Sequence, residues 1–326
     1  MDLIEVKQLV KKYGDHLAVD HLDFQMEAGK IYGFLGPNGA GKSTTMNIMT
    51  GYLGATSGEV IVDGHDILKE PEEAKKHIGY LPEIPPLYTD MTVMEYLKFA
   101  AELKGIPKEQ REDTLEEAMQ LTKLSEVGHR LIKNLSKGYR QRVGFAQAIL
   151  GFPDIIILDE PTVGLDPKQI IEIRELIRGL AKKHTVILST HILAEAREVC
   201  DEILIISKGK LVASDTPEHL ELLMNGAEMV EIETKAQPET VRTILSNVHG
   251  IRTITTETIG EGEPQEKTTL AKMEVEEGQD IREAVFYAFA KSEYPLLMLK
   301  TSKASLEEIF IELTQGEEEH EHAGNL

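Results

Sequence analysis

The sequence has few of the features that mark secreted or membrane-spanning proteins. Its 326 residues include one cysteine, which excludes an intrachain disulfide and suits a reducing compartment. Apolar runs such as Ile155–Leu158 are strand-sized, and none approaches the roughly 20 residues that cross a bilayer. The N-terminal MDLIEVKQLVKKYG alternates charged and apolar side chains, so we do not expect a signal peptide. Any membrane path that this protein serves is therefore expected on another chain.

Basic side chains are also scarce. The chain carries 35 Lys and Arg against 56 Asp and Glu, for a net charge of −21. Residues 221–326 alone hold 22 acidic and 9 basic side chains, so the last third is the most acidic part. Because binding to a phosphate backbone requires basic surface, no nucleic-acid partner is expected. The hydrophobic fraction of 41% is ordinary for a globular protein with a core.

Strand and helix patterns alternate over residues 1–217. The apolar runs 154–160 and 184–190 are typical of buried strands, while 42–49 and 167–183 are typical of helices. Such alternation predicts an α/β fold with a mostly parallel sheet and helices on both faces. Short alternating patterns at the N-terminus predict a small antiparallel β subdomain beside that sheet.

A helical insert interrupts this alternation. Residues 84–150 are predicted to be mostly helical, and the first helix begins at a T-x-x-E capping box formed by Thr92 and Glu95. A second helix is predicted from Pro107, and a third is predicted to end before Gly151. The insert therefore forms a subdomain of its own within the first 217 residues.

The pattern changes after Pro217. Strands and helices over residues 218–315 follow the order β-α-β-β-α-β, which predicts an accessory or regulatory α+β domain of ferredoxin-like type. A last helix is predicted from Ser305. Residues 316–326 are polar and acidic and are predicted to form a disordered tail.

The strongest motif lies between a predicted strand and a predicted helix. Residues 36–44, GPNGAGKST, fit the phosphate-loop pattern G-x-x-x-x-G-K-[ST]. Glycines let the backbone wrap phosphates with its N–H groups turned inward, and the helix N-terminus favours negative charge. We predict that Lys42 pairs with the β- and γ-phosphates of a nucleotide and that Ser43 binds Mg²⁺. The predicted nucleotide contacts of this segment are Gly36, Pro37, Asn38, Gly39, Ala40, Gly41, Lys42, Ser43, Thr44 and Thr45.

Two carboxylates follow the apolar run Ile155–Leu158. Asp159 and Glu160 come at the C-terminal end of this predicted strand, the edge at which ligands bind in open α/β sheets. Asp159 is predicted to hold Mg²⁺, directly or through water, and Glu160 to polarise the attacking water as general base. An acidic strand end can also merely cap the next helix. Beside a phosphate loop we favour the catalytic interpretation.

A third motif makes the pattern specific. The run LSKGY occupies residues 135–139, shortly before the acidic strand. With the phosphate loop and helical insert in this order, residues 3–217 resemble an ATP-binding-cassette ATPase, a P-loop NTPase with an LSGGQ-like signature. In that family two cassettes pack head to tail around ATP, each nucleotide lying between one phosphate loop and the other signature. The resemblance implies that Ser136 and Gly138 contact the second subunit's ATP, while Lys137 departs from the family pattern.

Other residues are placed only through this resemblance. Tyr13 matches the aromatic residue that stacks on adenine, which we favour over the alternative of a strand residue packed in the small β region. His191 matches the switch histidine that reaches the γ-phosphate, so the implied catalytic residues are Glu160, His191 and Lys42. The loop 164–166 matches the segment that signals between the two sites.

One position differs from the family. A glutamine usually follows the strand here written HIGYLP, where it touches Mg²⁺ or the attacking water and hinges to the membrane partner; this chain has Glu83. A carboxylate binds Mg²⁺ more strongly than an amide, yet it adds negative charge beside the phosphates. We therefore predict Ser43, Glu83 and Asp159 as metal ligands. Nucleotide binding is expected to be intact, whereas its coupling to the membrane partner is expected to be altered.

The segment IGYLPEIPPLYTDMTVMEYL and the run SLEEIFIELT resemble the ATPase subunits of bacterial exporters with separate membrane subunits. The resemblance implies a cassette dimer, either a homodimer or a pair with a close paralogue, that hydrolyses ATP to power export. The implied cofactors are ATP and Mg²⁺, and the implied partner is a transmembrane permease on another chain. The protein would then be cytoplasmic, peripheral on the inner face of the cell membrane, with its permease contact near Glu83 and residues 84–105.

Two other functions stay open at this level. One is a soluble cassette ATPase that acts without a membrane partner, for example in cofactor assembly. A chromosome-type enzyme would need a long coiled-coil insert and a translation factor normally has two cassettes, which this chain lacks. The other is a regulator whose acidic C-terminal domain binds a protein or small ligand and gates the ATPase. The sequence does not name the cargo.

Overall fold

The computed structural model describes residues 2–223, 229–259, 268–276 and 279–302. The chain divides after Pro217 into two compact units, and each has a hydrophobic core of its own. The helix predicted from Ser305 and the acidic tail predicted over 316–326 lie outside the described residues.

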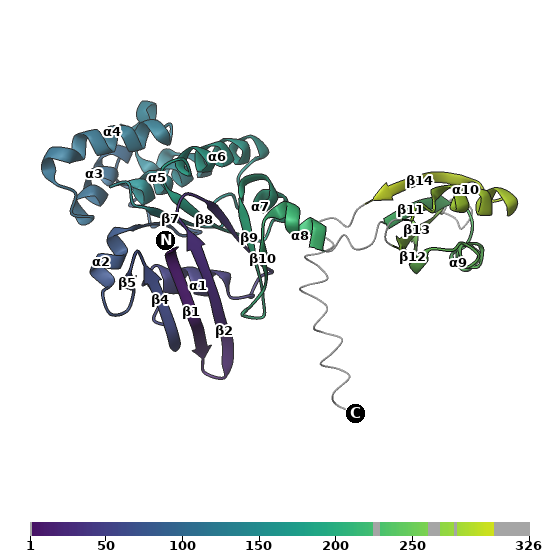
Figure 1. Cartoon of the computed structure of the whole chain (residues 1–326). Coiled ribbons are helices and arrows are strands. Elements are labelled where there is room, and N and C mark those ends of the chain that lie inside the picture. Colours follow the sequence, from purple (N-terminus) through teal and green to yellow (C-terminus); the bar gives the residue numbers. More distant parts are fainter. Residues whose placement is uncertain (1, 224–228, 260–267, 277–278, 303–326) are drawn as a thin grey trace. The chain divides into compact units, whose positions relative to one another are not determined.

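A mostly parallel sheet forms the centre of the first unit (Figure 1). Its strands are β3 (Ile31–Leu35), β6 (Ile78–Leu81), β7 (Ile155–Asp159), β8 (Thr185–Thr190), β9 (Glu202–Ser207) and β10 (Lys210–Asp215). The order is β10-β9-β3-β8-β7-β6, and each neighbouring pair is parallel except β9 with β10. Every residue of β3, β7 and β8 is buried, because helices cover both faces of a sheet of this kind. The predicted P-loop NTPase sheet is confirmed.

Helices connect the strands of this sheet. They are α1 (Lys42–Met49), α2 (Pro71–Lys76), α6 (Pro167–Leu180) and α7 (Leu193–Val199), while α8 (Pro217–Leu223) begins at the division between the units. The start of α6 is fixed by Asp166, whose carboxylate accepts a hydrogen bond from the Gln169 N–H at 3.0 Å. The sequence did not predict α2 and α8, because their six and seven residues are too few to establish the helical spacing of apolar side chains.

A small antiparallel sheet packs beside the parallel one. It contains β1 (Asp2–Tyr13), β2 (His16–Glu27), β4 (Ser57–Val62) and β5 (His65–Asp66) in the order β2-β1-β4-β5. Val6 and Phe24 from this sheet share one core with Met46 of α1 and Ile157 of β7. This common core fixes the β1–β2 hairpin, which ends at Tyr13 and His16, relative to the central sheet.

The predicted helical insert consists of α3 (Val93–Leu103), α4 (Arg111–Leu121) and α5 (Lys137–Ile149), gathered at the upper left of Figure 1. The capping box is present: Thr92 Oγ1 accepts from the Glu95 N–H at 3.2 Å, and Glu95 Oε2 accepts from the Thr92 N–H at 2.8 Å. The second predicted helix is shorter than expected. A 3₁₀ turn over Lys108–Gln110 precedes α4, which ends before Lys123, a residue with a φ of +57°.

The second unit is a small α+β sandwich. It contains β11 (Met229–Thr234), α9 (Pro238–Leu245), β12 (Ile251–Ile259), β13 (Thr268–Val275), α10 (Arg282–Lys291) and β14 (Leu296–Ser302). The sheet order is β12-β13-β11-β14, with every neighbouring pair antiparallel. Ile232, Met273 and Phe289 lie in its core, so one face of the sheet packs against the two helices. This order is that of the ferredoxin-like fold and confirms the predicted architecture.

Candidate nucleotide-binding site

The phosphate loop joins the end of β3 to the start of α1, as the motif requires. A Cβ atom on Gly36 would lie 2.4 Å from the carbonyl oxygen of Ile206, and one on Gly41 would lie 2.5 Å from that of Ala18. Gly41 also has a φ of +103°, which other residues rarely adopt. The two ends of the motif therefore pass too close to neighbouring backbone for any side chain, and glycine is required at both.

Lys42 is buried beneath this loop with only 6% of its surface exposed. Its Nζ donates to the carbonyl oxygens of Gly36 at 2.7 Å and Pro37 at 3.2 Å, and it lies 3.9 Å from Glu160 Oε1. Burial lowers the pKa of Lys42, while Glu160 and Asp159 act in the opposite direction. The ammonium group is thus held at the inner wall of the loop, where it favours a negatively charged ligand.

Asp159 ends β7 and lies against the first turn of α1. Its Oδ1 accepts a hydrogen bond from Ser43 Oγ at 3.3 Å and another from the Ser189 hydroxyl on β8. A hydroxyl and a carboxylate that meet at one point offer the hard oxygen ligands that Mg²⁺ prefers. The two residues therefore fit a magnesium site at this edge of the sheet.

Glu160 adopts a conformation that is uncommon for its residue type. Its φ is +47°, and its backbone N–H donates to the Ser189 carbonyl at 3.1 Å. This turn directs the carboxylate toward the end of β8, where His191 Nδ1 lies 3.0 Å from Oε1 and 2.9 Å from Oε2. Glu160 is 8% exposed, so its partners rather than bulk water determine where the carboxylate points.

Most of these side chains line one open cavity of about 470 Å³, whereas the predicted residues Gly36, Pro37, Ala40, Thr45 and Asp159 are not among those that line it. Predicted residues that line it are Tyr13, Asn38, Gly39, Gly41, Lys42, Ser43, Thr44, Glu83, Glu160 and His191. They come from sequence segments up to 178 positions apart, from Tyr13 to His191. The cavity is large enough for a nucleotide, since ligand pockets typically occupy about 300–1,000 Å³.

Three further residues line the same cavity without having been predicted: His16, Ala18 and Val163. His16 faces Tyr13 across the β1–β2 hairpin, where the two residues are paired. Tyr13 is 49% exposed, and Lys11 Nζ lies 5.2 Å from the centre of its ring. The ring is therefore not a packed core residue. The sequence contained a usable signal for His16, because it lies three residues from Tyr13 and a tight hairpin brings them together.

The predicted signature residues do not line this cavity. Ser136 caps α5, its Oγ accepting from the Tyr139 N–H at 3.4 Å. A Cβ on Gly138 would lie 2.6 Å from the side chain of Gln169, and one on Gly164 would lie 2.1 Å from Lys137 Nζ. The start of α5 thus packs closely on the loop and first turn of α6.

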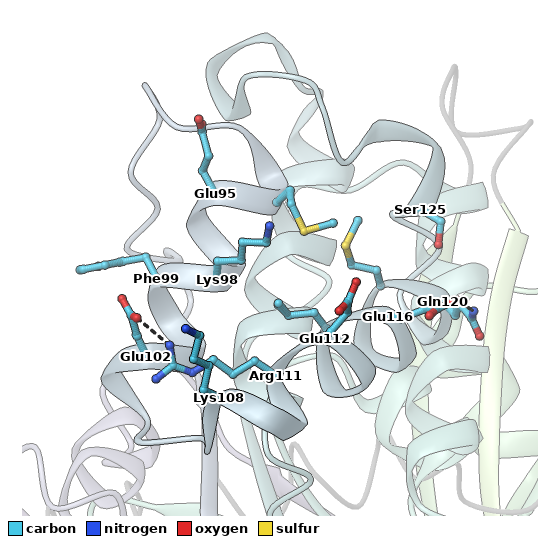
Figure 2. Close-up of a pocket in the computed structure, with 13 residues that line it drawn as sticks. Glu95, Lys98, Phe99, Glu102, Lys108, Arg111, Glu112, Glu116, Gln120 and Ser125 are labelled. Atoms are coloured by element: carbon cyan, nitrogen blue, oxygen red, sulfur yellow. Dashed lines mark hydrogen bonds and ion pairs between the residues drawn. The ribbon is translucent and has the colours of Figure 1, made fainter.

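A second hollow of about 920 Å³ lies within the helical insert, between α3 and α4 (Figure 2). Met94, Leu115 and Met119 give it apolar walls, and charged side chains surround them, including the ion pair between Arg111 Nη1 and Glu102 Oε1 at 2.6 Å. None of the predicted nucleotide contacts lines it. The phosphate-loop cavity, although the smaller of the two, is therefore the one that gathers predicted nucleotide contacts.

Comparison with known proteins gives the same class. The family model described as ABC transporter matches residues 19–163. The ABC transporter ATP-binding protein YhcH of Bacillus subtilis (strain 168) is 34% identical over 98% of this chain and 99% of its own length. The bacitracin transport ATP-binding protein BcrA of Bacillus licheniformis is 39% identical over 67% of this chain and 71% of its own.

Solved structures agree with these relatives. The ATP-binding subunit of an ABC transporter aligns with a TM-score of 0.62 at 32% identity, covering 68% of this chain and 92% of the other. A dimeric, post-hydrolysis structure of the ATP-binding cassette MJ0796 with ADP and phosphate aligns with a TM-score of 0.59 at 26% identity, covering 65% and 98%. Fold and site together define an ATP-hydrolysing P-loop cassette. This chain belongs to the ABC transporter family and is an ATP-binding subunit of that family.

Proposed function

We propose that this protein is the ATP-hydrolysing motor of an exporter whose membrane-spanning path lies on a separate permease chain. The observation that supports it most directly is the convergence of Lys42, Glu160 and His191 on one cavity. The role in export is supported by relatives: BcrA is named for bacitracin transport, and YbhF of Escherichia coli, 38% identical over 67% of this chain, as a probable multidrug transporter.

The proposed hydrolysis follows from the groups in the cavity. Phosphate-loop N–H groups and Lys42 bind the β- and γ-phosphates, and Tyr13 stacks on the adenine. Ser43, Asp159 and Glu83 would hold Mg²⁺, which when bound would supply positive charge against the charge that develops on the phosphates. Water attacks the γ-phosphorus and passes its proton to Glu160, while the bond to the ADP oxygen breaks. His191 fixes the Glu160 carboxylate through the hydrogen bonds between them.

A second cassette would complete each site. In this proposal two subunits pack head to tail, and Ser136 and Gly138 at the start of α5 contact the γ-phosphate held by the other subunit. The start of a helix is suited to this role, because its free N–H groups favour an anion. Lys137, which stands where the family has glycine, would add a positive charge at the same interface.

The permease is proposed to contact the face that includes Glu83 and α3. Ile84, which directly follows Glu83, is 81% exposed, and Tyr88, a little further along the same segment, is 55% exposed. The hollow between α3 and α4 adjoins the same helix (Figure 2). Within the described residues, no helix is both long and apolar enough to span a bilayer. We accordingly propose a cytoplasmic protein that is peripheral on the inner face of the cell membrane.

The decisive experiment is a pull-down of tagged Glu160→Gln protein from detergent-solubilised host membranes with ATP and Mg²⁺, read by mass spectrometry. Lys42→Ala protein, which should not bind ATP tightly, serves as the matched control. The proposal predicts a stoichiometric multi-span partner with Glu160→Gln. Recovery of soluble proteins alone would overturn the role in export and favour a cassette ATPase without a membrane partner.

For residues 218–315 we propose an accessory, regulatory role. Among the residues that the structure describes, all that line the nucleotide cavity belong to the first 217, and the second unit has a separate core. Deletion of residues 218–326 should therefore leave ATP binding intact while changing the ATPase rate or assembly with the permease. Unchanged ATPase and assembly would leave this domain without a regulatory role.

A further inference from the structure

A buried carboxylate outside the nucleotide cavity connects the two catalytic loops. Glu195 lies in the first turn of α7 and is 2% exposed. Burying a charged group is unfavourable unless it is hydrogen-bonded, so its position requires an explanation. An acidic residue that only complemented the helix dipole would not need to be buried, since such an interaction also stabilises a helix from its exposed surface.

Both hydrogen-bond donors to Glu195 are threonines of the catalytic loops. The Thr162 hydroxyl donates to Glu195 Oε2 at 2.8 Å, and the Thr190 hydroxyl donates to the same oxygen at 3.2 Å. Thr162 is 5% exposed and Thr190 is fully buried, so water does not compete for these bonds. One oxygen atom thus joins the loop after β7 to the end of β8.

The two threonines flank the catalytic pair. Thr162 follows Glu160 by two residues, and Thr190 directly precedes His191. Thr190 Oγ1 also accepts a hydrogen bond from the Ile192 N–H at 3.0 Å. This bond joins the residues on either side of His191 and so restrains its backbone. The hydrogen bonds between His191 and Glu160 therefore span two loops, and Glu195 joins the same two loops through its hydrogen bonds to Thr162 and Thr190.

We propose that Glu195 is a positioning residue for ATP hydrolysis, which holds the loops of Glu160 and His191 in register through Thr162 and Thr190. Glu195 is not among the residues that line the nucleotide cavity, and it acts through the direction in which Glu160 points. This inference rests on the proposed roles of Glu160 and His191. Removing these hydrogen bonds to Glu195 should lower kcat. The binding of ATP should stay nearly unchanged, because the phosphate loop makes it.

Thr162→Val is the main test, because valine keeps the shape of threonine and removes only the hydroxyl. We expect kcat to fall by roughly 10- to 100-fold, as for other small displacements of catalytic groups, with KM for ATP within about twofold. Thr162→Ser restores the hydroxyl and should recover most of the activity. Glu195→Ala is less informative, since it also leaves a buried space.

Thr122→Val is the matched control. Thr122 is likewise fully buried, and its hydroxyl donates to the Ala118 carbonyl at 2.7 Å at the end of α4, away from both catalytic loops. Its kcat should stay close to that of the parent protein. The double variant Thr162→Val with Thr190→Val should lower kcat by less than the product of the two single decreases, because both changes remove a hydrogen bond to the same Glu195 oxygen.

The outcomes separate this inference from the roles on which it rests. A decrease in kcat for Thr162→Val no larger than for Thr122→Val would overturn the positioning role. An increase in KM with no change in kcat would overturn it as well, and so would a Thr162→Ser protein as slow as Thr162→Val. Normal turnover by Glu160→Gln would instead contradict the assignment of the general base itself.

Discussion

The Glu160 carboxylate and the His191 imidazole lie within hydrogen-bond distance, with Nδ1 at 3.0 Å from one carboxylate oxygen and 2.9 Å from the other. Glu160 is buried, whereas the His191 side chain is 42% exposed toward the cavity. A buried carboxylate is thus oriented by an imidazole that itself lines the cavity.

Replacing Glu160 by glutamine should remove the general base and keep the shape of the site. We expect kcat to fall by roughly 10²–10⁴, the usual effect of losing such a base, with little change in the affinity for ATP. Steady-state phosphate release measures the first quantity and titration calorimetry the second. Glu202→Gln, a partly exposed acid at the start of β9, is the control and should hydrolyse ATP normally. Equal rates for the two variants would refute the assignment.

The burial of Lys42 predicts a pH effect on ATP binding. Burial lowers the pKa of this group from its ordinary value of 10.5 in the free protein, and bound phosphates favour the ammonium form and so raise it. Binding should therefore take up protons at alkaline pH, and the affinity for ATP should fall as the pH rises toward 10.5. Calorimetry in two buffers of different ionisation enthalpy measures this uptake. A proton uptake that does not change with pH across the alkaline range would show that Lys42 is not responsible.

Glu83 should influence the metal requirement. Because a carboxylate binds Mg²⁺ more strongly than an amide, Glu83→Gln should need a higher Mg²⁺ concentration for half-maximal ATPase. Ser43→Ala should shift the same curve in the same direction, since it removes another oxygen ligand. The idea is wrong if Glu83→Gln alters neither the ATPase rate nor its dependence on Mg²⁺.

The capping box of α3 should contribute to stability without affecting catalysis. Thr92→Ala removes the acceptor for the Glu95 N–H and should lower the free energy of unfolding by about 1 kcal/mol. Thr92→Ser keeps the acceptor and should be nearly neutral. Denaturant unfolding of the two variants and the parent checks both statements. A loss in Thr92→Ser as large as in Thr92→Ala would show that the hydrogen bond is not the cause.

The features that the sequence predicted are those that depend on residues adjacent in the chain. The phosphate loop is a continuous run, and a strand of four apolar residues necessarily presents Asp159 and Glu160 at its end. The order of strands and helices after Pro217 was likewise enough for the topology of the second unit. Because these features depend on local pattern, they were recognisable without a partner residue elsewhere in the chain.

What was missed depends on distant contacts. Glu195 lies 33 residues from Thr162, and nothing in the helix pattern of α7 indicates that its carboxylate turns inward. The positive φ of Glu160 is also invisible in the sequence, since glutamate rarely adopts it and tertiary contacts impose it. Short helices such as α2 fail for a simpler reason, because they offer fewer than two turns of periodic pattern.

We propose that this cavity binds ATP for hydrolysis between two subunits. Sedimentation velocity of Glu160→Gln protein with Mg²⁺ and ATP measures whether two subunits associate in solution. We expect a dimer with ATP, and a monomer with ADP or when Lys42→Ala is added to the same protein. A Glu160→Gln protein that binds ATP yet stays monomeric under every condition would contradict it.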